Sequence, residues 1–146
     1  MMELILWRHA EAEDGTPDNE RKLTAKGIKQ ASRMAKWLRA RMPDDAVIIA
    51  SPARRAQQTA RALGLEFKTV EQISTAASAD DVVQAAGWPG EDRTVVVVGH
   101  QPTLGETAAL LLTGKKAEWS LKKGAVIWLA RRADVAHARA QLRAAI

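Results

Sequence analysis

The chain of 146 residues contains no cysteine. This absence excludes disulfides, cysteine-ligated zinc, iron–sulfur clusters and every phosphatase or protease that uses a cysteine nucleophile. The chain also has no tyrosine and one phenylalanine, so it lacks the stacking aromatic side chains that bind single-stranded nucleic acid. Its net charge of +5 favours anionic partners, but the missing aromatics predict that nucleic acid is not among them.

Long hydrophobic runs are also missing. No apolar stretch approaches the ~20 residues of a membrane helix, and the N-terminal run is too short for a signal peptide and ends at Arg8. We therefore expect a soluble, cytoplasmic protein. Hydrophobic residues make up 47% of the chain and charged residues 27%, which predicts one globular domain over residues 1–146.

Common nucleotide and metal motifs are absent as well. The sequence contains no G-x-x-x-x-G-K-[ST], no G-x-G-x-x-G and no H-E-x-x-H. His9, Glu11 and His100 could in principle hold a metal ion, but two nearby arginines would repel a cation. We therefore expect no metal.

Alternating apolar runs and helical periodicities predict an α/β fold. Apolar runs at 3–8, 46–50, 94–98 and 125–130 are typical of buried strands, and a short extended stretch is expected near 66–70. Apolar spacings of three and four predict a helix over 24–42, and further helices are expected over 52–63, 79–86 and 103–113. Ser51 is the expected N-cap of the second helix, with Pro52 at its first position. The order predicts a three-layer α/β/α sandwich around a mostly parallel sheet, while the tail over 135–142 fits a strand or a helix.

Basic side chains follow three of the predicted strands. Ligands of open α/β sheets bind at the carboxyl ends of the strands, where Arg8 and His9, then Arg54 and Arg55, and finally His100 are expected. Arginine pairs clamp phosphoryl oxygens, and a neutral histidine can attack phosphorus to form a covalent intermediate. A second histidine, if protonated, can stabilise the charge of the transition state. These residues predict phosphoryl chemistry.

Four segments carry a family resemblance. They occur in family order and resemble the histidine phosphatase superfamily, most closely its small SixA-type phosphohistidine phosphatase branch, from the first strand to about residue 113. The segments are Arg8-His9-Ala10-Glu11-Ala12, Leu23-Thr24-x-x-Gly27, Ser51-Pro52-x-x-Arg55-x-x-Gln58-Thr59 and Val98-Gly99-His100-Gln101-Pro102. The resemblance implies a phosphoglycerate mutase-like fold and a reaction that needs neither a metal nor an organic cofactor.

The resemblance also implies roles for individual residues. His9 matches the phosphorylated nucleophile, and Arg8, Arg55 and His100 match the rest of the phosphate pocket. Arg21 resembles a basic position at the mouth of that pocket. One departure is Ala10, which stands where the superfamily usually has glycine and which requires an ordinary negative φ.

The general acid is not assigned by the resemblance. The carboxylates that could serve, in order of preference, are Asp80, Asp81, Glu71 and Glu11. An alkyl phosphate ester needs a proton donor for its alkoxide, whereas phosphohistidine can leave as a neutral imidazole. An acid-poor site therefore favours cleavage of a P–N bond, and so short a chain leaves no room for a lid that would enclose a small substrate.

The favoured function is metal-independent hydrolysis of phosphohistidine on a protein, as in signal transduction, with inorganic phosphate as a product. The alternatives are a small-molecule phosphatase acting on sugar or nucleotide phosphates, and a phosphate-binding or protein-interaction module without turnover. Mutase activity is not expected, because it needs a site that retains the substrate. The basic stretch over 22–41 is either a solvated helix face or a docking surface for an acidic partner protein.

Overall fold

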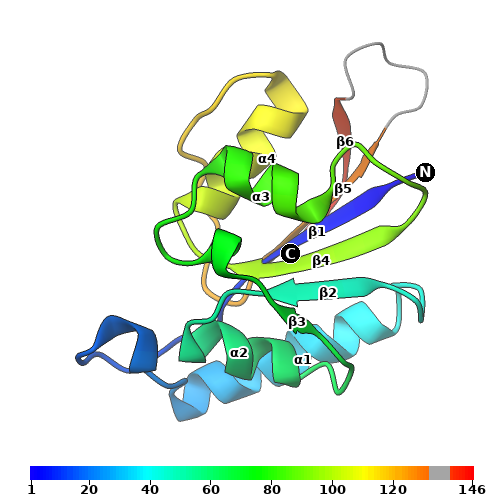
Figure 1. The fold of residues 1–146 in the computed structure, drawn as a ribbon. Coiled ribbons are helices and arrows are strands. Elements are labelled where there is room, and N and C mark those ends of the chain that lie inside the picture. The colour runs from blue at the N-terminus through cyan, green and yellow to red at the C-terminus, as the bar shows by residue number, and fades with distance from the viewer. Residues whose placement is uncertain (132–138) are drawn as a thin grey trace.

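The computed structural model describes residues 1–131 and 139–146, whose strands form one mixed sheet (Figure 1). The strand order is β3-β2-β4-β1-β5-β6. Strands β3, β2, β4 and β1 run parallel to one another, and β5 and β6 are antiparallel additions at one edge. The strands are β1 (Glu3–Arg8), β2 (Val47–Ala50), β3 (Lys68–Thr69), β4 (Thr94–Gly99), β5 (Val126–Arg131) and β6 (Ala140–Ala145).

Helices cover both faces of the sheet (Figure 1). Helices α1 (Ala25–Arg39) and α2 (Arg54–Arg61) lie on one face, and α3 (Ala79–Ala86) and α4 (Thr103–Thr113) lie on the other. Alternate side chains of β1 serve the two layers: Ile5 and Trp7 pack in the core under α1 and α2, while Leu4 packs in the core under α3 and α4. All six residues of β4 are buried, as a central parallel strand requires. The predicted three-layer architecture is confirmed.

Several predicted boundaries were wrong. Helix α2 begins at Arg54, with Ala53 rather than Ser51 at its N-cap, because the Ser51 N–H donates to Val98 O and continues the sheet. Helix α1 ends at Arg39, three residues earlier than expected. Residues 140–145 form a strand, and residues 135–138 of the ambiguous tail lie outside the described part.

The register of the parallel strands places their carboxyl ends at one edge. Arg8 of β1 is paired with Gly99 of β4, and Ala50 of β2 is paired with Val98. The residues that follow these positions therefore leave the sheet side by side. Two of them are the histidines that the sequence singled out, His9 and His100.

In the part of the chain that the structure describes, none of the helices is both long and apolar enough to cross a membrane. The longest, α1, has 15 residues.

Candidate active site

A cavity of about 300 Å³ lies at the carboxyl ends of β1, β2 and β4. The structure brings together there five residues that the sequence predicted for the site: Arg8, His9, Arg21, Arg55 and His100. Its other lining residues are Ala12, Asp14, Thr75, Gln101 and Lys123. Four cationic side chains and one carboxylate line the cavity, so it favours an anion.

His9 is held as a neutral imidazole with one defined hydrogen. The residue is 7% exposed, and Nδ1 lies 2.8 Å from the carbonyl oxygen of Ala10. A carbonyl only accepts, so Nδ1 carries the hydrogen and Nε2 carries the lone pair. Burial lowers the pKa of His9 to about 4, and the nearby Arg55 and Arg8 add to this effect. At neutral pH the ring therefore has an unprotonated Nε2, the form that a nucleophile needs.

Ala10, whose carbonyl oxygen orients His9, is itself held by helix α2. The Ala10 N–H donates to Thr59 Oγ1 at 3.0 Å, and Thr59 in turn donates to Arg55 O at 2.7 Å. Both Ala10 and Thr59 are fully buried. The threonine of the third family-like segment thus helps to hold the backbone of Ala10, whose carbonyl oxygen orients the ring of His9.

Arg55 reaches the cavity from the first turn of α2. Its side chain is buried, whereas the neighbouring Arg54 is exposed, because adjacent helical side chains point about 100° apart. The Arg55 Nε donates to His9 Nε2 at 3.4 Å, and Nη1 donates to the carbonyl oxygen of Asp18 at 2.8 Å. The guanidinium is therefore fixed beside the lone pair of His9.

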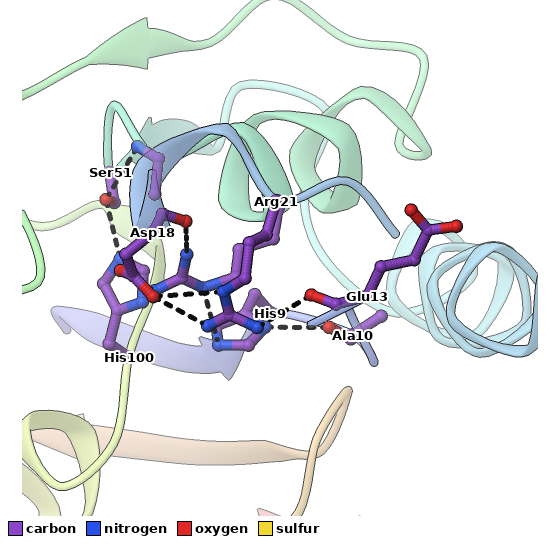
Figure 2. Close-up of polar contacts among 9 residues, drawn as sticks. His9, Ala10, Glu13, Asp18, Arg21, Ser51 and His100 are labelled. Atoms are coloured by element: carbon purple, nitrogen blue, oxygen red, sulfur yellow. Dashed lines mark hydrogen bonds and ion pairs between the residues drawn. The ribbon is translucent and has the colours of Figure 1, made fainter. Parts of the chain in front are cut away.

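Asp18, which sequence reasoning missed, bridges two of the arginines (Figure 2). It lies in the short 3₁₀ turn η1 (Asp18–Glu20). Its carboxylate lies 3.0 Å from Arg55 Nη2 and 3.0 Å from Arg21 Nη2. Hydrogen bonds from Arg55 and then Arg21 hold the pKa of Asp18 below its usual range. The one signal in the sequence was its position three residues before Arg21.

His100 is buried beside His9, with the two ring centroids 5.3 Å apart. Burial lowers the pKa of His100 to about 3, with further contributions from His9 and Arg55. The unliganded ring is therefore neutral at pH 7, which differs from the protonated donor considered from the sequence. Its Nε2 lies 2.7 Å from Ser51 Oγ (Figure 2), a contact that the sequence did not suggest.

The remaining cations come from the end of β1 and from two loops. Arg8 Nη1 donates to Leu121 O at 2.8 Å, and Arg21 Nη1 donates to Glu13 O at 3.0 Å. Lys123, which sequence reasoning also missed, comes from the loop between α4 and β5. The anion site thus combines strand ends, one helix start and two loops.

The four carboxylates considered from the sequence lie outside the lining of the cavity: Asp80, Asp81, Glu71 and Glu11. Asp80 is exposed and pairs with Lys116 at 2.6 Å, while Asp81 forms a capping box with Ser78 at the start of α3. Asp14 is the one carboxylate among the described lining residues. Within the described ranges, no group of three or more His, Cys, Asp or Glu residues is placed to hold a metal ion.

Comparisons with known proteins agree with this geometry. The model of the histidine phosphatase superfamily (branch 1) matches residues 4–80. An uncharacterised protein of Mycobacterium tuberculosis is 34% identical over 109 residues, which cover 71% of this chain and 68% of that protein.

Solved structures extend the similarity to nearly the whole chain. A candidate phosphohistidine phosphatase SixA from Nakamurella multipartitia is 27% identical, with a TM-score of 0.81 over 99% of this chain and 95% of that one. The protein histidine phosphatase SixA complexed with tungstate is 20% identical and shares the fold, with a TM-score of 0.82 over 99% and 96% of the two chains. The expected SixA-type branch is confirmed.

Proposed function

This chain belongs to the histidine phosphatase superfamily and is a phosphatase, and we propose that its substrate is phosphohistidine on a protein. In this proposal His9 is the nucleophile, and Arg8, Arg55 and His100 bind the phosphoryl oxygens. Arg21 contributes positive charge at the mouth of the cavity. No metal takes part, because the cationic side chains supply the charge that the transition state needs.

The first step transfers the phosphoryl group to His9. The Nε2 lone pair forms a bond to phosphorus while the bond from phosphorus to the substrate imidazole breaks. The Nδ1 hydrogen stays on His9, where it makes a hydrogen bond to Ala10 O with an Nδ1–O distance of 2.8 Å. When the other nitrogen of the substrate ring is protonated, the substrate leaves as a neutral imidazole, so this step consumes no proton.

The second step returns the enzyme to its starting form. Water attacks phosphorus, the bond to His9 Nε2 breaks, and the proton lost by water leaves with inorganic phosphate or solvent. His9 regains the Nε2 lone pair and keeps the Nδ1 hydrogen. Burial and the surrounding arginines keep the pKa of the free ring near 4, so the regenerated histidine is ready for another cycle at neutral pH.

The observation that carries the choice of a P–N bond is that two carboxylates near the cavity, Asp18 and Asp80, are already paired with cations. Asp18 is held ionised by Arg55 and Arg21, and Asp80 lies outside the cavity lining in an ion pair with Lys116. Neither is arranged to give a proton to a departing alkoxide, whereas general acid catalysis requires a donor within hydrogen-bond reach. A leaving group that departs neutral suits such a site.

A groove beside the cavity supports a protein substrate. It has a volume of about 320 Å³ and lies between α1 and the turn before β5. Met34 and Trp37 are among its apolar lining residues, and Arg33, Lys122 and Lys123 give it positive charge, with no Asp or Glu among the lining residues that the structure describes. Because Lys123 also lines the cavity, an acidic surface around the phosphorylated histidine would meet this groove when the phosphoryl group is bound.

A small-molecule phosphomonoesterase is the second candidate, and one observation favours it. Asp14 lines the cavity and could protonate an ester leaving group. If esters are good substrates, Asp14→Asn should lower their turnover and spare phosphohistidine.

The deciding experiment compares two substrates with metal-free protein. A phosphohistidine-bearing protein and p-nitrophenyl phosphate are each incubated with the wild type, His9→Ala and Arg54→Ala. We expect fast P–N cleavage and slow ester cleavage by the wild type and by the exposed-arginine control, and loss of both in His9→Ala.

Other outcomes are equally informative. Ester cleavage as fast as P–N cleavage would replace the proposal with the small-molecule phosphatase. No turnover of either substrate would leave a phosphate-binding module, and full turnover by His9→Ala would overturn the nucleophile assignment.

A further inference from the structure

The buried hydroxyl of Ser51 contacts the second histidine of the site. Ser51 follows β2 and is fully buried. Its N–H donates to Val98 O, so it continues the register of β2 against β4. This places Ser51 Oγ 2.7 Å from His100 Nε2 (Figure 2). The contact joins residues that are 49 positions apart, and it results from the pairing of β2 with β4 in the sheet.

The hydrogen-bond partners of Ser51 Oγ determine the direction of this contact. The backbone N–H of Ala53 donates to the oxygen at 3.2 Å. A backbone N–H can only donate, so the oxygen accepts there and still has one hydrogen to give. Within the described residues, His100 Nε2 is the one acceptor that this hydroxyl contacts. Since a buried hydroxyl donor without an acceptor is costly, the Ser51 O–H donates to Nε2.

This direction fixes which nitrogen of His100 carries the hydrogen. A nitrogen that accepts a hydrogen bond has no hydrogen of its own, so the neutral ring carries its hydrogen on Nδ1. That atom is buried and has no hydrogen-bond partner among the described residues, although the ring lines the phosphate cavity. An unpaired buried donor beside an anion site is available for an oxygen of the ligand.

We propose that Ser51 is a positioning residue that holds His100 as the neutral Nδ1–H tautomer, so that this N–H donates to a phosphoryl oxygen. The assignment deepens the proposed function, on which its catalytic part rests. The low pKa of His100, about 3, agrees with a neutral ring in the unliganded protein.

Ser51 and Ala10 thus hold the two histidines in the same tautomer, with the hydrogen on Nδ1, but prepare them for different roles. Ala10 O accepts from Nδ1 of His9 and so leaves the lone pair on Nε2, where Arg55 Nε contacts it at 3.4 Å until a phosphoryl group is bound. Ser51 donates to Nε2 of His100 and leaves the Nδ1–H free to donate. One ring is prepared as a nucleophile and the other as a hydrogen-bond donor, and neither needs to be charged.

Nitrogen-15 NMR of the ring nitrogens tests the tautomer without any substrate. The chain has three histidines, so the signals are assigned with His9→Asn and His100→Asn. In the wild type at pH 7, we expect the Nδ1 of His100 to carry the hydrogen and Nε2 to have none. In Ser51→Ala, the other tautomer should become populated. A hydrogen on Nε2 of His100 in the wild type would overturn the proposal, and this result does not depend on whether Ser51→Ala folds.

A double-mutant cycle tests whether Ser51 acts through His100. With whichever substrate the wild type hydrolyses, His100→Ala should lower kcat about 10²-fold or more, as loss of a transition-state donor does. Ser51→Ala should lower kcat about tenfold and should have no further effect in the His100→Ala background. An equal loss from Ser51→Ala in both backgrounds would show that the residue acts elsewhere. A protein without phosphatase activity would refute the proposed function while leaving the NMR result to judge the tautomer.

Discussion

The floor of the cavity and its mouth are built in different ways. On the floor, His9, Arg55 and His100 are each less than 10% exposed, and each has a ring or guanidinium atom bonded to a protein group. At the mouth, Asp18 and Asp14 are exposed, and among the described residues the Asp18 carboxylate is bonded only to the guanidinium groups of Arg21 and Arg55.

This difference separates two parts of the reaction. The buried groups are oriented before the substrate arrives, so they can stabilise charge at phosphorus without reorganisation. In the proposed reaction, the exposed groups would leave the departing part of the substrate in contact with solvent and with the basic groove. On this account the floor recognises the phosphoryl group, and the choice of leaving group is expected to rest on the chemistry and the docking surface of the substrate.

The largest effect should come from changing the floor. Arg55→Lys keeps the positive charge but loses the planar fork that contacts Asp18 and His9. We expect kcat to fall about 10²-fold, as for loss of one preorganised donor. Arg54→Lys is the matched control on the same helix turn and should stay within about twofold of the wild type, since its side chain is exposed. Equal losses of kcat in the two variants would show that the buried Arg55 contributes no more to catalysis than the exposed Arg54.

A smaller effect should follow from reversing charge in the groove. The double variant Arg33→Glu/Lys122→Glu should lower kcat/KM for the phosphoprotein about tenfold, with a loss that shrinks at high salt. Hydrolysis of p-nitrophenyl phosphate should not change, because neither residue lines the cavity. Equal losses of kcat/KM for both substrates would mean that the two substitutions disturb the cavity itself rather than the docking of a protein substrate.

Lowering the pH should reduce the stability of the folded protein through the two buried histidines of the floor. Their pKa values are about 4 and about 3 in the folded chain, against about 6.5 when unfolded. Between these values the unfolded state binds more protons, so the free energy of unfolding falls as the pH is lowered from 6.5 toward 4, with a slope near 1.4 kcal/mol per pH unit for each ring. Urea unfolding of His100→Asn should show a shallower pH dependence than the wild type. An unchanged slope would contradict the burial of a neutral ring.

Removing the charge of Asp18 should strengthen the binding of an anion, because this carboxylate competes with the anion for Arg21 and Arg55. We expect Asp18→Asn to bind inorganic phosphate a few-fold more tightly, consistent with about 1 kcal/mol for an exposed ion pair. Isothermal titration calorimetry measures this directly. Weaker binding would show instead that Asp18 holds the arginines in their working positions.

The smallest effect is expected at α3. Asp80→Asn breaks an exposed ion pair with Lys116 and should leave the hydrolysis of both substrates within about twofold of the wild type. A tenfold loss confined to p-nitrophenyl phosphate would identify Asp80 as the ester acid, despite its place outside the cavity lining.

The parts of the fold and site that the sequence predicted are those with local or repeated signals. The apolar run at 94–98 and the spacing of three and four in α1 predicted their elements, and the rule that strand ends share an edge placed His9 near His100. The roles of Ser51 and Asp18 depend on contacts between residues 49 and 37 positions apart. Ser-Pro is also a common start of a helix, and the sequence therefore suggested that Ser51 caps α2. Only the pairing of β2 with β4 shows that the Ser51 side chain contacts His100 instead.

The central claim is that the buried, neutral His9 carries the phosphoryl group during turnover. Rapid quenching of the wild type mixed with ³²P-labelled substrate, followed by mapping of the labelled peptide, tests it most directly. We predict an acid-labile, base-stable label on the peptide that contains His9, formed and lost at rates that account for turnover, and absent in His9→Ala. Turnover without a labelled enzyme, or a label on another residue, would contradict the claim.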